Sequence, residues 1–244
     1  MSVHLSAIES NHEWLDSRVP NGFWHERRNR VTYMNWLGTK LGFVRYEDWY
    51  QIRNQDFRRN RGATLLNRFY RSSVLEAMRD MLPDYAWLPW LFSKAPRGFW
   101  DEAENRRAYM KWLQGTLQLE TEENWYQLTE ESFNENRGAG LLTNYYHGSI
   151  LSALEEYRPD IDWKPWRFRK VPNGYWSLTG NRQRYFDWLA DRLTYRSLSD
   201  WDNLTRRIVC DSGAAGLLSH FYGGSLLRLR DDVAAVYAKN MVDA

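Results

Sequence analysis

A 76-residue period in the tryptophans constrains this chain more than any other feature of its sequence. All 14 tryptophans fall into five columns, and successive members of each column keep this one period. The columns are Trp14/Trp90/Trp166, Trp24/Trp100/Trp176, Trp36/Trp112/Trp188, Trp49/Trp125/Trp201 and Trp87/Trp163. Self-similarity at a fixed period is the sequence signature of a tandem-repeat architecture. The sequence therefore predicts one structural unit used several times.

The period divides the chain into three repeats, at residues 20–95, 96–171 and 172–244. Residues 1–19 contain Trp14 and are predicted to be a partial preceding repeat or N-terminal cap. The first two repeats each end with a closing tryptophan pair, Trp87/Trp90 and Trp163/Trp166. The third repeat lacks this pair, so it is predicted to be truncated at its C-terminal end. A unit as short as one period is near the lower limit for burying its own core. The aromatic content of 16% compensates, because large rings bury much area per residue.

Local patterns within the middle repeat predict helices separated by turns. Tyr109, Trp112, Leu113 and Leu117 form one helical stripe at i, i+3, i+4 and i+8. After residue 128, a helix begins at Thr129, a short apolar helix covers 141–146, and a last helix runs from 150 to 157. Ser149 is expected to cap that last helix and Pro159 to end it. No strand of useful length appears, so the fold class is all-α.

The succession of short helix, three-residue turn and capped helix is typical of a helix-turn-helix. The tandem array is therefore predicted to consist of three helix-turn-helix-like repeats. Six recurring tryptophans are expected to form the structural core of the repeats: Trp36, Trp112, Trp188, Trp49, Trp125 and Trp201. The pair at 163 and 166 is expected to pack between neighbouring repeats.

No arrangement of residues predicts catalysis, a cofactor or a metal site. The five histidines do not recur at the repeat period, and the single cysteine, Cys210, supports neither a disulfide framework nor a cysteine zinc site. Three near-equal copies favour an extended binding surface over a single active site. The start of the chain lacks a signal-peptide pattern, and no apolar run is long enough for a membrane span. We therefore expect a non-enzymatic, intracellular protein, nuclear or cytoplasmic and not secreted.

Charge is distributed unevenly among the repeats. Residues 20–95 carry a net charge of +6, residues 96–171 carry −3 and residues 172–244 carry +1. The last helix of the second repeat is expected to expose Glu155 and Glu156, which would repel a phosphate backbone. The residues predicted to contact nucleic acid are Arg27, Arg28, Arg30, Arg58, Arg59, Arg61, Arg68, Arg71, Arg79, Arg228 and Arg230. A solvated helix face is the alternative interpretation for arginines between the apolar stripes.

The middle of each unit resembles the helical repeats associated with homing endonucleases. In the second repeat the resemblance rests on Trp125-Tyr126, Leu128-Thr129, Leu141-Leu142-x-x-Tyr145-Tyr146 and Gly148-Ser149-x-x-x-Ala153-Leu154-x-x-Tyr157-x-Pro159. The chain is also similar to tryptophan-rich tandem repeats of unassigned function in eukaryotic and large-virus proteins. The first repeat departs from the pattern with Arg71-Ser72-Ser73 at the turn, and the third has Arg228 and Leu229 near the Ala-Leu position. The first resemblance implies a DNA-binding module.

These features favour a nucleic-acid-binding tandem-repeat protein that acts mainly through its basic first repeat, with DNA preferred over RNA. The alternative is a protein–protein interaction scaffold built on the same repeats. The expected partner is thus nucleic acid or another protein, with no membrane, metal or cofactor involved. Whether the arginines of the first repeat form one patch separates the two interpretations.

Overall fold

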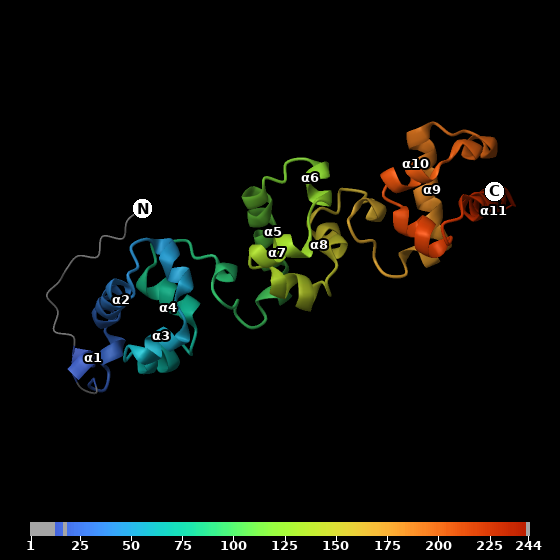
Figure 1. Cartoon of the computed structure of the whole chain (residues 1–244). Helices are drawn as coiled ribbons and strands as arrows, with labels where there is room; N and C mark the ends of the chain where they lie inside the picture. Colours follow the sequence, from blue (N-terminus) through green and yellow to red (C-terminus); the bar gives the residue numbers. More distant parts are fainter. Residues whose placement is uncertain (1–12, 17–18, 243–244) are drawn as a thin grey trace. The chain divides into compact units, whose positions relative to one another are not determined.

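A 15-residue helix recurs three times in the computed structural model, which describes residues 13–16 and 19–242 (Figure 1). The three helices are α2 (Arg27–Leu41), α5 (Ala103–Leu117) and α9 (Thr179–Leu193), and their first residues are 76 positions apart. Each buries a tyrosine of one column, namely Tyr33, Tyr109 or Tyr185, with no exposed surface. The described residues contain no β-strand, which confirms the all-α prediction for that part of the chain.

Four elements follow each long helix, and all of them except Leu226–Val242 are shorter than it. After α2 these are η2 (Tyr46–Gln51), α3 (Asn54–Arg59), the π-helical turn η3 (Leu65–Phe69) and α4 (Val74–Met81). After α5 they are α6 (Glu122–Tyr126), α7 (Glu130–Glu135), the π-helical turn η6 (Leu141–Tyr145) and α8 (Ile150–Tyr157). After α9 they are η9 (Leu198–Asn203), α10 (Arg206–Asp211), the π-helical turn η10 (Leu217–Phe221) and α11 (Leu226–Val242).

A short 3-10 turn precedes each long helix, and one further 3-10 turn follows α4 and another follows α8. The turns before the long helices are η1 (Phe23–His25), η5 (Phe99–Asp101) and η8 (Tyr175–Ser177). Each follows a glycine in the left-handed region; at Gly174, for example, φ is 73°. The turns η4 (Pro89–Leu91) and η7 (Pro165–Arg167) carry the second tryptophan of each closing pair, and α1 (Glu13–Asp16) carries Trp14. Most of residues 1–19, the predicted partial repeat, lie outside the described residues.

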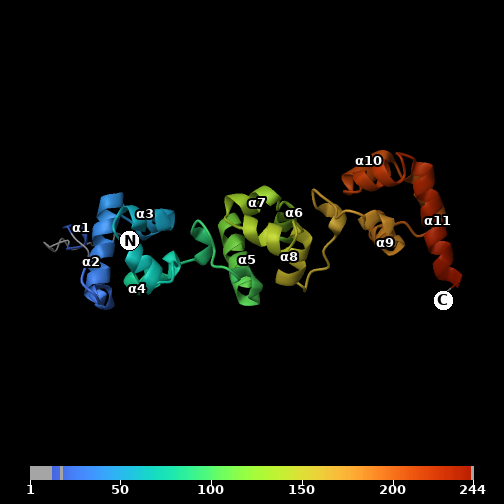
Figure 2. The same ribbon diagram turned by 90° about the horizontal axis from the view of Figure 1, so that it is seen from below.

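Contacts divide the chain into two compact units, Met1–Tyr109 and Met110–Ala244, and the division falls inside α5. In unit 1, α2 packs against α4, and Figures 1 and 2 both show them side by side. In unit 2, α11 packs against α9 and η9.

Side-chain caps begin the short helices where the sequence places serine or threonine. The hydroxyls of Ser73, Thr129 and Ser149 accept the amide hydrogens of the residues three positions on, at 3.1–3.2 Å. These contacts satisfy amides that have no partner inside the helix. At Ser73 the contact is not reciprocal, because the Glu76 carboxylate pairs with Arg79 instead.

The last helix is much longer than its counterparts. Helices α4 and α8 have 8 residues each, whereas α11 has 17. Pro83 and Pro159 stand just after the two short helices, and proline cannot continue a helix. Ala235 occupies the corresponding position in the last helix, and Val233 and Val236 are buried on either side of it. The helix therefore continues and buries a second apolar turn.

The tryptophans differ in burial between columns. Trp49, Trp125 and Trp201 are buried. Trp36, Trp112 and Trp188 are only half-buried, and Trp36 and Trp188 pack against the buried cores of their units. Trp36 lies beneath Lys40, and Trp188 beneath Arg192, with the cation 4.9 and 5.4 Å from the ring centroid. A cation one turn further along the helix thus covers each of these two rings.

The closing tryptophan pair of residues 110–244 joins two clusters of aromatic side chains within unit 2. Trp163 packs edge to face on Tyr126, with ring centroids 5.5 Å apart. Trp166 is fully buried and lies 5.4 Å from the rings of Tyr185 and Trp188. Trp166 therefore belongs to the core that α9, α10 and α11 build, although it precedes the Pro172–Gly174 turn.

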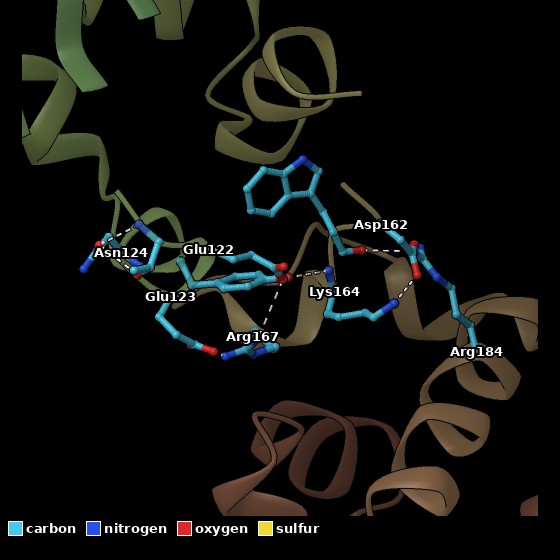
Figure 3. A network of polar contacts seen from close by, with 10 residues as sticks. Glu122, Glu123, Asn124, Asp162, Lys164, Arg167 and Arg184 are labelled. Atoms are coloured by element: carbon cyan, nitrogen blue, oxygen red, sulfur yellow. Dashed lines mark hydrogen bonds and ion pairs between the residues drawn. The ribbon is translucent and has the colours of Figure 1, made fainter. Parts of the chain in front are cut away.

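Polar contacts hold the segment between the two tryptophan clusters (Figure 3). Lys164 and Arg184 both contact the Asp162 carboxylate. Arg167 contacts Glu123, and its guanidinium carbon lies 4.2 Å from the Tyr126 ring centroid. The hydrogen bond to Glu123 raises the pKa of Arg167 above its ordinary value, although partial burial opposes this effect. The segment is therefore fixed to α6 on one side and to α9 on the other.

Candidate nucleic-acid interface

Helix α3, the π-helical turn η3 and the residues next to them carry a group of exposed arginines in unit 1. The Asp56 carboxylate accepts the Arg53 amide hydrogen at 2.8 Å and so begins α3. Phe57 is fully buried and anchors the helix to the core. The helix ends where Arg61 adopts the left-handed conformation, with φ 65°, and the Gly62 amide donates to the Phe57 carbonyl at 2.7 Å. Gly62 leaves no room for a Cβ because the Tyr33 ring packs directly against it.

The chain then folds back, which brings the turn after η3 close to the start of α3. The Asn54 side-chain amide donates to the Ser72 carbonyl at 3.1 Å. Because α3 has six residues, it is about 9 Å long. The length of α3 thus separates two groups of arginines. Arg58, Arg59 and Arg61 lie at its C-terminal end, and Arg71 lies near its N-terminal end.

Five arginines of this segment are exposed: Arg58, Arg59, Arg61, Arg68 and Arg71. None of the five forms an ion pair with a described residue. Residues 53–79 hold seven arginines against only Asp56 and Glu76. The corresponding residues 129–155 hold Arg137 against four glutamates. Residues 53–79 therefore carry positive charge that few nearby acidic residues balance, whereas residues 129–155 do not.

A contact between two aromatic rings brings a second arginine-bearing segment, which contains Arg27 and Arg28, next to η3. Phe69 on η3 is 38% exposed, and its ring meets that of His25 edge to face with centroids 5.9 Å apart. His25 ends η1 and stands two residues before Arg27 and three before Arg28, which are both exposed. Although Arg27 donates to the Asp80 carbonyl at 3.1 Å, its side chain stays at the surface. The contact of Phe69 with His25 thus links arginines from two well-separated segments of the sequence.

Arg30 was expected to contact nucleic acid, and this prediction is wrong. Its guanidinium donates to Asp80 at 2.9 Å and to the carbonyls of Trp24 and His25 at 3.0 and 2.9 Å. Only 6% of the residue is exposed, so it is not available to a ligand. Burial raises the pKa of Asp80, but hydrogen bonds from Tyr70 and Arg30 outweigh it, and the net pKa lies below its ordinary value.

The same arrangement recurs in unit 2 and defines a structural cluster. Arg182 donates to Asp232 at 2.6 Å and to the Trp176 carbonyl at 2.8 Å, while the Tyr222 hydroxyl donates to the same carboxylate at 2.5 Å. Arg106 is buried as well and donates to the Trp100 carbonyl at 2.8 Å. Asp232 therefore belongs to an ion pair with a buried arginine.

The helices expected to be recognition helices expose little unpaired positive charge. On α4, Arg79 pairs with Glu76 at 3.1 Å. On α8, Glu155 is exposed, whereas Glu156 is half-buried and has interaction partners. On α11, Arg228 is exposed, but Arg230 donates to the carbonyls of Asp202 and Leu204 at 2.7 and 2.9 Å. Arg79 of α4 is thus paired, whereas the arginines on and beside α3 and η3 and at the first two positions of α2 are exposed without an ion pair to a described residue.

Sequence reasoning missed His25 and Phe69. The signal for Phe69 is present, because Phe69, Tyr145 and Phe221 form a recurring aromatic column directly before Tyr70, Tyr146 and Tyr222. Phe69 and Phe221 are both exposed. The signal for the buried arginines is a second column, in which Asp80, Glu156 and Asp232 keep the 76-residue spacing of Arg30, Arg106 and Arg182.

A separate hollow lies in unit 2, with a volume of about 740 Å³. Its walls are the starts of α7 and α8, the turn between η6 and α8, and the segment after η7. Its lining combines apolar side chains such as Ile150 and Val171 with the charged pair Lys170 and Glu130, whose atoms are 2.9 Å apart.

The described residues hold no group of three or more metal-ligating side chains. No helix of the described part of the chain is both long and apolar enough to cross a bilayer. Comparison with protein-family models, with curated proteins and with solved structures finds no match.

Proposed function

We propose that this chain binds nucleic acid, with DNA favoured over RNA, through an arginine surface on unit 1. The arginine surface comprises Arg27, Arg28, Arg58, Arg59, Arg61, Arg68 and Arg71. The observation that carries the proposal is the exposure of these seven side chains on segments that the contact of Phe69 with His25 brings together. Arginine is suited to such a surface because its planar guanidinium can bind phosphate oxygens in pairs. The proposed activity is binding without catalysis.

We also propose that the chain is a tandem array of three helix-turn-helix-like repeats. The 15-residue helices, the six-residue helices α3, α7 and α10, and the three π-helical turns all recur with the 76-residue period. The pattern of π-helical turn, three-residue turn and serine-capped helix supports a helix-turn-helix-like geometry. Within this array the second repeat is acidic at the segment that corresponds to the arginine surface. Binding by the array is therefore uneven, and the first repeat contributes most of it.

The test is a titration of the full chain with fluorescent oligonucleotides over a range of salt concentrations. Binding is expected at about 50 mM salt and to weaken steeply as salt rises, because bound cations displace counterions from the phosphates. Replacing Arg58, Arg59 and Arg61 together by Glu is expected to abolish binding. All three side chains are exposed, so the fold should survive.

The matched control replaces three exposed cations outside the arginine surface, Arg107, Lys111 and Arg169, by Glu. This variant undergoes the same change in net charge and is expected to keep most of the affinity. Equal losses in the two variants would show that only total charge matters. The absence of binding in the parent at about 50 mM salt would reject the proposal.

A protein–protein interaction scaffold is the second candidate function. The observation that favours it is the 740 Å³ hollow of unit 2, whose lining offers both apolar and charged side chains to a partner. Replacing Ile150 by Arg would block the hollow without touching the arginine surface. Nucleic-acid binding that survives this substitution supports the first function, and a nucleic-acid-binding role would place the protein in the nucleus or the cytoplasm.

A further inference from the structure

We infer that the arginine surface binds a single-stranded nucleic acid and that Phe69 stacks against one of its bases. This inference rests on the proposed function and adds the class of nucleic acid. Phe69 lies beside Arg68 in the chain, and its ring contacts His25, which precedes Arg27 and Arg28.

Phe69 is an exposed aromatic ring held in a fixed orientation. The Arg30 guanidinium carbon lies 4.4 Å from its ring centroid, and the rings of His25 and Tyr70 meet it edge to face at 5.9 and 5.0 Å. Arg30 is itself immobilised by Asp80 and two carbonyls. The ring is therefore supported from behind, and 38% of the residue remains open to solvent. A supported, exposed ring is the platform on which an unpaired base stacks.

The cations around Phe69 are placed to follow a phosphate backbone past this platform. Arg68 is its neighbour in the chain, and Arg71 follows two residues later in the turn. Arg27 and Arg28 follow two and three residues after His25, whose ring contacts that of Phe69. Cations flanking an aromatic ring are the usual composition of single-strand binding sites, where bases stack and phosphates meet the charges.

The structure gives less support to insertion of a helix into a duplex groove. The exposed polar side chains of α4 include Glu76 and Arg79, which neutralise each other at 3.1 Å. Reading base edges in the major groove requires several free side chains on one helix. The unpaired bases of a single strand are available for stacking, whereas those of a duplex are already stacked on their neighbours.

Unit 2 supplies a matched control at Phe221. Phe221 is 42% exposed, its ring lies 4.6 Å from the Arg182 guanidinium carbon, and its ring centroid is 5.0 Å from that of Tyr222. Its support thus matches that of Phe69 at the arginine and the tyrosine, while Ser177 stands where His25 contacts Phe69. Its surroundings differ, because His220 replaces Arg68 and Gly223 replaces Arg71 in the repeat frame. Loss of the ring should therefore disturb the fold equally at both positions but affect binding only at Phe69.

The experiment compares the parent, Phe69→Ala, Phe69→Trp and Phe221→Ala by fluorescence anisotropy. The probes are a labelled thymidine oligonucleotide of about 20 nucleotides, longer than a typical single-strand site, and a duplex of equal length. We expect the single strand to bind tighter, with affinity about tenfold weaker in Phe69→Ala, retained in Phe69→Trp, and within about twofold of the parent in Phe221→Ala. The salt dependence of Phe69→Ala should equal that of the parent, since no charge is removed.

Two results would overturn the inference in distinguishable ways. If Phe69→Ala binds the single strand as tightly as Phe221→Ala does, or if the duplex is preferred, stacking is rejected while the nucleic-acid-binding function stands. If the parent binds neither probe, both the inference and the proposed function fail. Thermal melting of Phe69→Ala and Phe221→Ala, expected to be lowered to the same extent, shows that any difference in affinity does not arise from unfolding.

Discussion

Tyr70 donates its hydroxyl hydrogen to the Asp80 carboxylate, the same group that receives the Arg30 guanidinium. One acceptor thus joins α2, the end of η3 and α4. Tyr222, Asp232 and Arg182 repeat this relationship in unit 2. A carboxylate with two donors, one of them a buried cation, leaves an uncompensated charge if it is removed.

Replacing Asp80 by Asn should therefore destabilise unit 1 by about 2 kcal/mol, the scale of hydrogen bonds to a charged group. The control is Glu76→Gln, which breaks an exposed pair and should cost a few tenths of a kcal/mol. Calorimetric melting of both variants measures the difference. Equal melting temperatures for the two variants would contradict a structural role for the cluster.

The pH dependence of the parent follows from the same carboxylate. The pKa of Asp80 in the folded state lies below its ordinary value. A depressed carboxyl pKa contributes stability that is present above the unfolded pKa of about 3.9 and is lost as pH falls through the folded pKa. The stability gap between the parent and Asp80→Asn should therefore be full at pH 7 and shrink below about pH 4. A gap that stays constant down to pH 3 would refute the assignment.

The two tryptophan columns should differ in their contribution to stability. Trp125 is 1% exposed, so its replacement by Ala should cost about 3–5 kcal/mol. Trp112 is half-buried, and its replacement should cost roughly half as much, because less ring surface returns to water. Both substitutions lie in unit 2, which makes their melting curves directly comparable. A larger loss at Trp112 would show that the difference in burial is not what sets the cost.

Trp166 and Arg167 are adjacent in the chain and should respond very differently to substitution. Trp166→Ala empties a fully buried site among Tyr185, Trp188 and Trp176 and should cost about 3–5 kcal/mol. Arg167→Ala removes partly exposed contacts to Glu122 and Glu123, worth about 1 kcal/mol or less. Amide hydrogen exchange in α9 reports both changes. Strong loss of protection in Arg167→Ala would mean that the polar network, rather than the tryptophan, holds this segment.

Each arginine neutralised within the arginine surface should lower the salt dependence of binding by about one phosphate contact. Arg68→Gln with Arg71→Gln removes two cations, so the slope of log affinity against log salt should fall by about 2. Titration at several salt concentrations measures the slope. The same pair of changes at Arg107 and Arg169 should leave it unaltered, and a reduced slope there would show that the interface extends beyond the arginine surface.

Local signals in the sequence were sufficient where neighbouring residues decide the structure. Thr129 and Ser149 could be recognised as caps because each bonds to an amide only three residues away. Pro159 ends α8 by the same kind of local constraint. The burial of Arg30 could not be recognised in this way, since its partner Asp80 is 50 residues distant. An arginine on a helix is normally solvated, and only the fold shows that this one is internal.

The π-helical turns and the Phe69 site illustrate the same limit. Leu141 to Tyr145 has an apolar pattern that predicts a short helix, but that pattern does not distinguish a π-helical turn from an α-helix. The contact between Phe69 and His25 joins η3 to η1, two elements that the whole of α2, η2 and α3 separates in sequence. The charge of the first repeat was visible in the sequence, but its association with an exposed ring was not.

The placement of Trp166 has a consequence for cutting this chain into fragments. The boundary with the clearest sequence signal is the turn at Pro172, yet a fragment that starts there loses the indole that fills the core of α9, α10 and α11. A fragment that starts at residue 160 keeps Trp166, the Asp162 contact to Arg184 and the whole of that core. A cut that keeps the core of α9, α10 and α11 intact must therefore lie upstream of Trp166 rather than at the Pro172 turn.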